Sequence, residues 1–183
     1  MPRIEQPNDE QLSDESKEML SQVKQKMGKV PNVLRIMAQS PAALKAYLSF
    51  SQALESGHFS GRDKELIALA VSQVNACNYC LAAHTAAAKG AGADDETVRR
   101  ARLGEAEDPR MHAALAFARA VAKRQGWADD DDLRRARDAG LSEAEILELI
   151  AHVAFNVLTN YTNHVAETDL DFEEVQPASA LDD

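Results

Sequence analysis

The stretch SGRDKELIALAVSQVNACNYCLAAH, residues 60–84, contains the signals that decide the fold of this chain. The run from Glu65 to Val71 is too apolar on all sides for a surface helix, which predicts a helix buried inside the protein. Asn75 is a good N-cap, so we expect the helix to break there. A second helix should then begin near Cys77 and continue to Lys89.

The rest of the chain carries the start and stop signals of further helices. Expected starts are N-cap residues, some of them followed by Pro or part of a capping box: Ser13, Ser40-Pro41, Ser60, Asp94, Asp108-Pro109, Asp129 and Ser142. Expected stops are Gly28, Gly57, Gly90, Gly126 and Gly140, and the last helix reaches about Ala166. No segment alternates long enough to predict a strand. We therefore predict an all-α fold, one domain over 1–183 with a core motif at about 59–92 and a frayed tail at 169–183.

Composition restricts the function. The net charge of −10 disfavours a nucleic-acid partner, because proteins that follow phosphates are normally basic. No apolar stretch approaches the ~18 residues of a transmembrane helix, and Met1–Leu12 lacks the apolar core of a signal peptide. We expect a cytoplasmic protein that binds neither nucleic acid nor a membrane.

The only two cysteines, Cys77 and Cys80, lie three positions apart. A bridge across so short a gap closes almost no loop, so a structural disulfide is a poor interpretation. Haem attachment requires His directly after the second Cys, where this chain has Leu81. A redox dithiol on a helical scaffold is the main prediction. A zinc site of Cys77, Cys80 and His84, with Glu65 as a further candidate ligand, stays as an alternative.

Helical spacing brings the candidate catalytic residues together. Cys77, Cys80 and His84 stand at i, i+3 and i+7, on one helical face. A thiol attacks as thiolate, and a helix N-terminus or a nearby His favours that form. Glu65 can reach His84 if the two helical segments fold side by side, and it would then orient the ring and carry protons. A surface pairing of Glu65 with a neighbouring cation is the plainer alternative.

The last long helix carries a second polar pattern. His152, Asn156, Asn160 and His164 recur at every fourth position among apolar residues. The plain interpretation is a subunit-facing or solvated stripe, and the functional one makes His152 and Asn156, together with Tyr79, lining residues of the site pocket. The tetrapeptide Glu-Leu-Ile-Ala occurs at both 65–68 and 148–151, which suggests a decayed internal duplication.

Glu65, the Cys77-Asn-Tyr-Cys80 motif and His84 resemble the alkylhydroperoxidase D-like family within the carboxymuconolactone decarboxylase superfamily. The flanking segments, including 28–33 and Ser40-Pro41, resemble its "peroxidase-related" subgroup. Well-studied peroxidases of the family have His directly before the second Cys, where this chain has Tyr79. Tyrosine is a poor proton relay at neutral pH, although the dithiol chemistry does not depend on it.

The resemblance implies an all-α homo-oligomer (a dimer, trimer or hexamer) that reduces small hydroperoxides. Carried over by position, Cys80 is the peroxidatic cysteine and Cys77 the resolving one, with His84 and Glu65 as proton relay. No cofactor is implied beyond the redox-active Cys77–Cys80 disulfide, which an external dithiol or adaptor protein reduces. The alternatives are a superfamily enzyme with a lactone or carbonyl substrate, and a redox-sensing or zinc-stapled oligomer without catalysis.

Overall fold

The computed structural model describes residues 2–175, and every regular element in this range is a helix, which confirms the all-α prediction. A short 3-10 helix, η1 (Asp9–Gln11), precedes the α-helices. These are α1 (Asp14–Met27), α2 (Asn32–Met37), α3 (Pro41–Glu55), α4 (Gly61–Val74), α5 (Asn78–Gly90), α6 (Asp95–Leu103), α7 (Pro109–Lys123), α8 (Asp130–Asp138) and α9 (Glu143–Ala166).

The predicted start signals form the helix caps. Each capping side chain accepts a hydrogen bond from a backbone N–H three residues later, at Ser13, Ser40, Ser60, Asp94, Asp108, Asp129 and Ser142. Three of them, at Ser60, Asp129 and Ser142, are complete capping boxes. The starts of these helices therefore follow from local sequence.

The turn between α4 and α5 differs from the prediction in one respect. Asn75 is the C-cap of α4, and Cys77 is the N-cap of α5. The turn is closed by backbone groups: the N–H of Cys77 donates to the carbonyl of Ser72 at 3.0 Å, across a left-handed Ala76 with φ of 53°. A left-handed alanine costs about 1 kcal/mol, and it allows α5 to start two residues later than Asn75 would. As a result, Cys80 lies in the first turn of α5.

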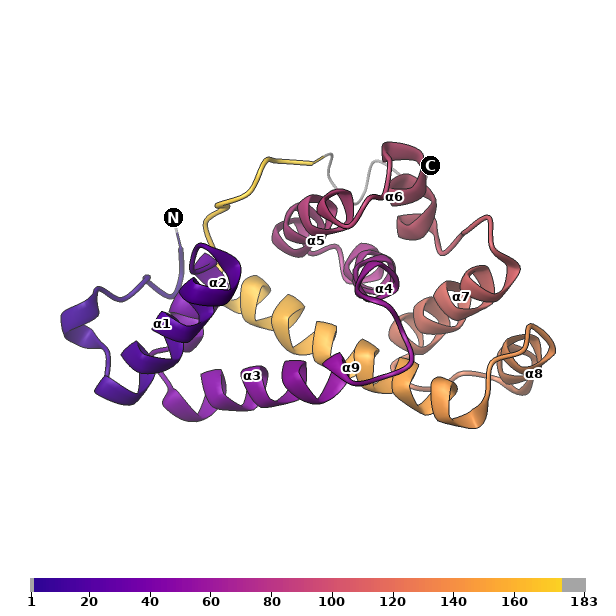
Figure 1. Ribbon diagram of the computed structural model, residues 1–183, viewed down its shortest axis with the longest axis horizontal. Coiled ribbons are helices and arrows are strands. Elements are labelled where there is room, and N and C mark those ends of the chain that lie inside the picture. The colour runs from indigo at the N-terminus through magenta and orange to yellow at the C-terminus, as the bar shows by residue number, and fades with distance from the viewer. Residues whose placement is uncertain (1, 176–183) are drawn as a thin grey trace.

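Helix α4 occupies the centre of the molecule, with α5, α6, α7 and α9 packed around it (Figure 1). Its Ile67, Leu69 and Val71 have no exposed surface, as expected for a helix that is apolar on all sides. A second buried cluster joins α1, α2 and α3 to the first turn of α5, where it includes Cys77, Tyr79 and Cys80. The N-terminal helices therefore cover the cysteine pair.

The segment Asp169–Val175, here called the C-terminal strap, runs from the end of α9 past α2 towards α5 (Figure 1). The Lys29 ammonium donates to the carbonyl of Asp171 at 2.8 Å and lies 3.6 Å from the centre of the Phe172 ring. The Tyr79 hydroxyl donates to Oδ1 of Asp171 at 2.6 Å. The strap is the first part of the tail 169–183 that was predicted to be frayed, and side chains of other elements bind it. Residues 176–183 lie outside the described residues.

One face of α9 exposes apolar side chains. Leu147, Ile150, Leu158, Tyr161 and Val165, here called the α9 stripe, are each between 40% and 67% exposed. Their spacing keeps them on one side of the helix. Although α9 is the longest element, no helix within residues 2–175 is both long and apolar enough to cross a membrane.

Candidate active site

The two cysteines lie together at the start of α5. Both are free thiols, with 1% of Cys77 and 3% of Cys80 exposed. The thiol of Cys77 hydrogen-bonds to the sulfur of Cys80. The positive end of the α5 dipole favours a negative charge in this turn. The arrangement therefore suits a thiolate on one sulfur with the other as its hydrogen-bond donor.

A carboxylate and an imidazole lie next to this pair. His84, one turn after Cys80 on α5, has its Nδ1 2.7 Å from Oε2 of Glu65 on α4. The two side chains are about one quarter exposed, 25% for His84 and 28% for Glu65, so they are more open to solvent than the sulfurs. The packing of α5 against α4 thus joins residues 19 positions apart into one hydrogen-bonded pair.

Two asparagines of α9 complete the surroundings of Cys80. Asn163 Nδ2 donates to Sγ of Cys80 at 3.2 Å. Asn160, which is fully buried, also hydrogen-bonds to Cys80, and its amide donates to Ser72 Oγ at 3.3 Å. Hydrogen bonds to a charged acceptor favour the charged form, so both amides stabilise a thiolate.

These contacts give the two thiols different pKa values. The hydrogen bond from Cys77 lowers the pKa of Cys80 to about 6 against the opposing effect of burial, with help from the charge of His84 and from the two asparagines. The same hydrogen bond, together with burial, raises the pKa of Cys77 above its usual range. At neutral pH, Cys80 is therefore the thiolate and Cys77 the thiol.

The pKa of the His84 imidazole is raised, whereas that of the Cys80 thiol is lowered. Burial lowers the pKa of His84, but the charge of Glu65, its hydrogen bond and the charge of Cys80 outweigh burial and raise that pKa above its usual value. Above about pH 6, up to the raised pKa of His84, the site holds a thiolate beside an imidazolium. This is a nucleophile with an adjacent general acid.

The three residues expected to line a pocket have other partners. The Tyr79 hydroxyl lies between Asp171 and the N–H of Val33, and burial followed by the Asp171 hydrogen bond raises the pKa of Tyr79 above its usual range. The Asn156 amide donates to the carbonyl of His152 on its own helix at 2.8 Å. The His152 ring packs edge-on against Phe59. The structure thus brings together Glu65, Cys77, Cys80 and His84. Tyr79 packs in the same buried cluster as the two cysteines, whereas the contacts described for Asn156 and His152 are with their own helix and with Phe59.

The sequence analysis did not assign three residues to the site: Asn160, Asn163 and Tyr47. Asn163 lies three positions after Asn160, on the same helical face, so extending the polar pattern by one turn would have found it. Tyr47 of α3 stacks on Phe155 with ring centres 4.9 Å apart and packs against the cluster of the cysteines. Burial, then the charges of Glu65 and Cys80, raise the pKa of Tyr47 to about 12. No pattern in the sequence pointed to Tyr47.

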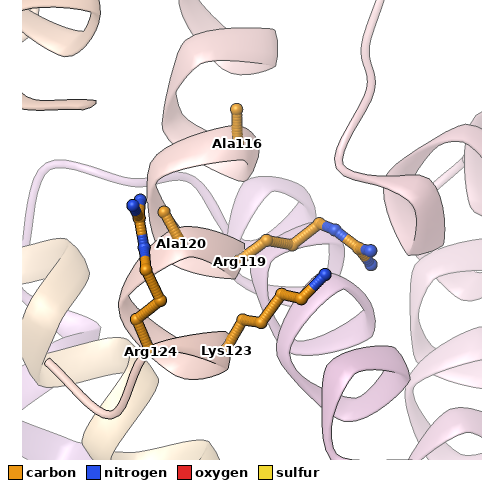
Figure 2. Close-up of a pocket in the computed structure, with 5 residues that line it drawn as sticks. All are labelled: Ala116, Arg119, Ala120, Lys123 and Arg124. Atoms are coloured by element: carbon orange, nitrogen blue, oxygen red, sulfur yellow. The ribbon is translucent and has the colours of Figure 1, made fainter. Parts of the chain in front are cut away.

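A surface hollow on α7 lies away from the cysteine site. The hollow, of about 420 Å³, is lined by Ala116, Arg119, Ala120, Lys123 and Arg124. In Figure 2, its cationic side chains extend in different directions from the last turns of the helix. Arg124 is already paired with Asp129 and Asp132, and Arg119 donates to the carbonyl of Arg102. This hollow shares no residue with the cysteine site.

The zinc alternative requires three or more ligands close together. Within residues 2–175, no group of three or more His, Cys, Asp and Glu side chains is placed to hold a metal ion.

The chain is similar to a known protein family and to several solved structures. Residues 41–124 match the model of the carboxymuconolactone decarboxylase family. The alkylhydroperoxidase AhpD core protein of Ralstonia eutropha JMP134, an uncharacterized peroxidase-related protein, is 26% identical, with a TM-score of 0.83 over 93% of this chain and 92% of that one. A peroxidase-related protein of Silicibacter sp. TM1040 is 24% identical, with a TM-score of 0.80 over 96% and 94%.

The debrominase Bmp8 shares the fold at 20% identity, with a TM-score of 0.78 over 98% of this chain and 96% of that one. No protein of curated function matches the chain in sequence.

Proposed function

We propose that this chain, which belongs to the superfamily of alkylhydroperoxidase D-like and carboxymuconolactone decarboxylase proteins, reduces small organic hydroperoxides through Cys77 and Cys80. The observation that carries the proposal is the Glu65–His84 hydrogen bond of 2.7 Å beside a Cys80 whose pKa is lowered to about 6. Thiol peroxidases need a nucleophilic thiolate, a proton for the leaving oxygen and a second thiol. All three groups lie in one place here.

In the first step, the Cys80 thiolate attacks the outer oxygen of R–O–O–H. The S–O bond forms as the O–O bond breaks, which leaves Cys80 sulfenic acid and an alkoxide. The alkoxide takes a proton from the His84 imidazolium and leaves as alcohol. Glu65 keeps His84 protonated, since its charge and hydrogen bond raise the pKa of His84.

In the second step, the sulfur of Cys77 displaces the hydroxyl of the Cys80 sulfenic acid, which gives a disulfide and water. The contact between the two thiols supports this pairing, because no large movement is needed. Two electrons from an external dithiol then reduce the disulfide. The cycle requires no other cofactor.

A thiol titration tests the proposal directly. One equivalent of cumene hydroperoxide should remove two thiols per chain and yield one equivalent of the alcohol. The count is unambiguous because the chain has only two cysteines. A chain in which both are replaced by Ser is the control for oxidation elsewhere, above all of Met. Two thiols that stay intact in the wild-type protein would contradict the proposal and favour an oligomer without catalysis or an enzyme with a lactone or carbonyl substrate.

Reduction of a carbon–bromine bond is a second candidate, favoured by the fold shared with Bmp8, which has been crystallised as its C82A variant with 2,3,4-tribromopyrrole. A dithiol supplies the two electrons: a ring C–Br and two S–H groups give C–H, a disulfide and HBr. The same titration with 2,3,4-tribromopyrrole distinguishes the two candidates by which compound oxidises the thiols.

We also propose that the α9 stripe joins copies of this chain in a homo-oligomer. Contiguous exposed apolar side chains of this kind mark interaction sites on protein surfaces. In analytical ultracentrifugation, the wild-type protein should sediment at a multiple of the chain mass. The Leu147→Glu, Val165→Glu double variant should sediment as a smaller species, because charges at the stripe remain unpaired in the interface.

The matched control is Ala116→Glu, an exposed alanine on a different helix, α7. A wild-type protein that sediments as a monomer, or a control that dissociates equally, would contradict the interface.

A further inference from the structure

Only one of the two polar atoms of the Asn163 carboxamide has a hydrogen-bond partner within the described residues. The residue is 96% buried, and its Nδ2 donates to Sγ of Cys80 at 3.2 Å. Its Oδ1 has no hydrogen-bond partner among the described residues, although it is shielded from solvent. Buried carbonyl oxygens are nearly always paired, because leaving one unpaired costs free energy. An unpaired acceptor on the same carboxamide that binds the reactive sulfur therefore indicates a ligand that the site receives.

The position of this acceptor defines the ligand. The two ends of the carboxamide are rigidly connected, so the open Oδ1 lies beside the sulfur that Nδ2 holds. An oxygen atom in contact with that sulfur is within reach of Oδ1 if it carries a hydrogen to donate. The outer oxygen of a hydroperoxide has both properties, since it is the atom under attack and it carries the O–H.

We propose that Asn163 is a catalytic residue of the peroxide step: its Nδ2 holds the Cys80 sulfur, and its Oδ1 accepts the O–H of the bound hydroperoxide. The inference rests on the function proposed above. During the attack, the sulfur–oxygen bond forms and the oxygen–oxygen bond breaks, while the hydrogen stays on the outer oxygen. The hydrogen bond to Oδ1 therefore persists from the hydroperoxide to the sulfenic acid and holds the outer oxygen in line for displacement.

The proposed role of Asn163 differs from that of His84. His84 supplies a proton to the inner oxygen as it leaves, whereas Asn163 orients the outer oxygen and transfers no proton. Loss of Asn163 should therefore slow the reaction even where Cys80 is fully ionised. A residue that only stabilised the thiolate would matter at low pH and become dispensable at high pH.

Two substitutions separate the two halves of the carboxamide. Asn163→Ala removes both donor and acceptor, whereas Asn163→Asp removes the donor but keeps an acceptor oxygen. Alkylation of Cys80 by iodoacetamide across pH reports ionisation, and rapid-quench thiol loss with cumene hydroperoxide on the high-pH plateau reports the reaction with peroxide. Thr159→Ala is the matched control: Thr159 is buried on the same helix, and its hydroxyl donates to the carbonyl of Asn156 at 2.9 Å.

Both Asn163 variants should shift the alkylation midpoint to higher pH, because the thiolate loses a hydrogen-bond donor. On the plateau, Asn163→Ala should react with peroxide about tenfold more slowly than the wild-type protein, the usual effect of losing one hydrogen bond in a transition state. Asn163→Asp should stay within about threefold of wild type there, and plateau alkylation should change little in either variant.

A plateau peroxide rate that is unchanged in Asn163→Ala would overturn the proposal, as would an equal loss in Thr159→Ala, which would indicate a general effect of α9 packing. Failure of the proposed function itself would be distinguishable, since the wild-type thiols would then not react with the hydroperoxide at all. Thermal unfolding followed by circular dichroism identifies any variant that does not fold, and Asn163→Asp, nearly isosteric with Asn, keeps the test available in that case.

Discussion

Replacement of Cys80 by Ser should abolish hydroperoxide reduction, with a loss of at least about a thousandfold in the rate of peroxide consumption. The reason is the ionisation described above: Cys80 is the group with a pKa of about 6, and a serine hydroxyl in its place stays protonated. The single thiol of Cys77 does not substitute for it, because burial opposes the ionisation of Cys77. Peroxide consumption by a coupled or colorimetric assay provides the measurement.

The matched variant, Cys77→Ser, should behave differently. Its Cys80 should still react once with hydroperoxide, and the sulfenic acid should then accumulate, because no second thiol displaces its hydroxyl. A dimedone adduct confined to Cys80 by mass spectrometry is the expected result. Adducts on Cys77 of the Cys80→Ser chain, or equal turnover in both variants, would reverse the assigned roles.

Replacement of His84 by Gln should lower the rate constant for hydroperoxide about a hundredfold, within the usual range for losing a general acid. Alkylation of Cys80 should respond less. Its midpoint, near pH 6 in the wild-type protein, should rise by about one to two units because the thiolate loses the charge of His84. Iodoacetamide needs a thiolate but no proton donor, so comparison of the two reagents separates ionisation from proton transfer.

Glu65→Gln should affect the other limb of the pH profile. In the wild-type protein, the rate with peroxide rises as Cys80 ionises near pH 6 and falls as His84 loses its proton at its raised pKa. Without the carboxylate, the pKa of His84 falls, so the descending limb should move to lower pH. Lys64→Gln, on the same helix and next to Glu65, is the control for a change of charge. An unmoved descending limb in Glu65→Gln would contradict the relay.

The starts of the helices were predictable because caps are local. Ser60, Asp129 and Ser142 satisfy backbone groups three residues away, and no distant part of the chain decides the outcome. Asn75 was assigned to the wrong helix end because its role depends on the left-handed Ala76, and nothing in the sequence favours that conformation for alanine. The same shift sets where α5 begins.

The candidate site was predictable where its residues share one motif and unpredictable where they come from distant helices. Glu65, Cys77, Cys80 and His84 stand within 20 positions, and helix periodicity indicates how they converge. Tyr47 and Asn163 reach the site through the packing of α3 and α9, which periodicity does not specify. The residues that hold the strap also lie far from it in the sequence, on α5 and in the loop between α1 and α2.

The internal similarity offers one further signal for Asn163. Glu65 precedes Cys77 and Cys80 by 12 and 15 positions, and Glu148 precedes Asn160 and Asn163 by the same two intervals. If the two segments descend from one ancestor, the asparagines occupy the positions of the lost cysteines. A register comparison of the two copies would then have pointed to both amides.

The cover that α1, α2 and α3 form over the start of α5 has a consequence for the recycling half of the reaction. Both sulfurs are almost completely buried, whereas a folded reductase carries its reactive thiol on a bulky surface. We expect such an electron donor to reach the sulfurs only when the covering helices move away from α5. This movement is a local opening of the fold, and it costs free energy. With a protein donor, the turnover rate should then be limited by how often α1, α2 and α3 move away from the start of α5, and not by the rate of the reaction with hydroperoxide.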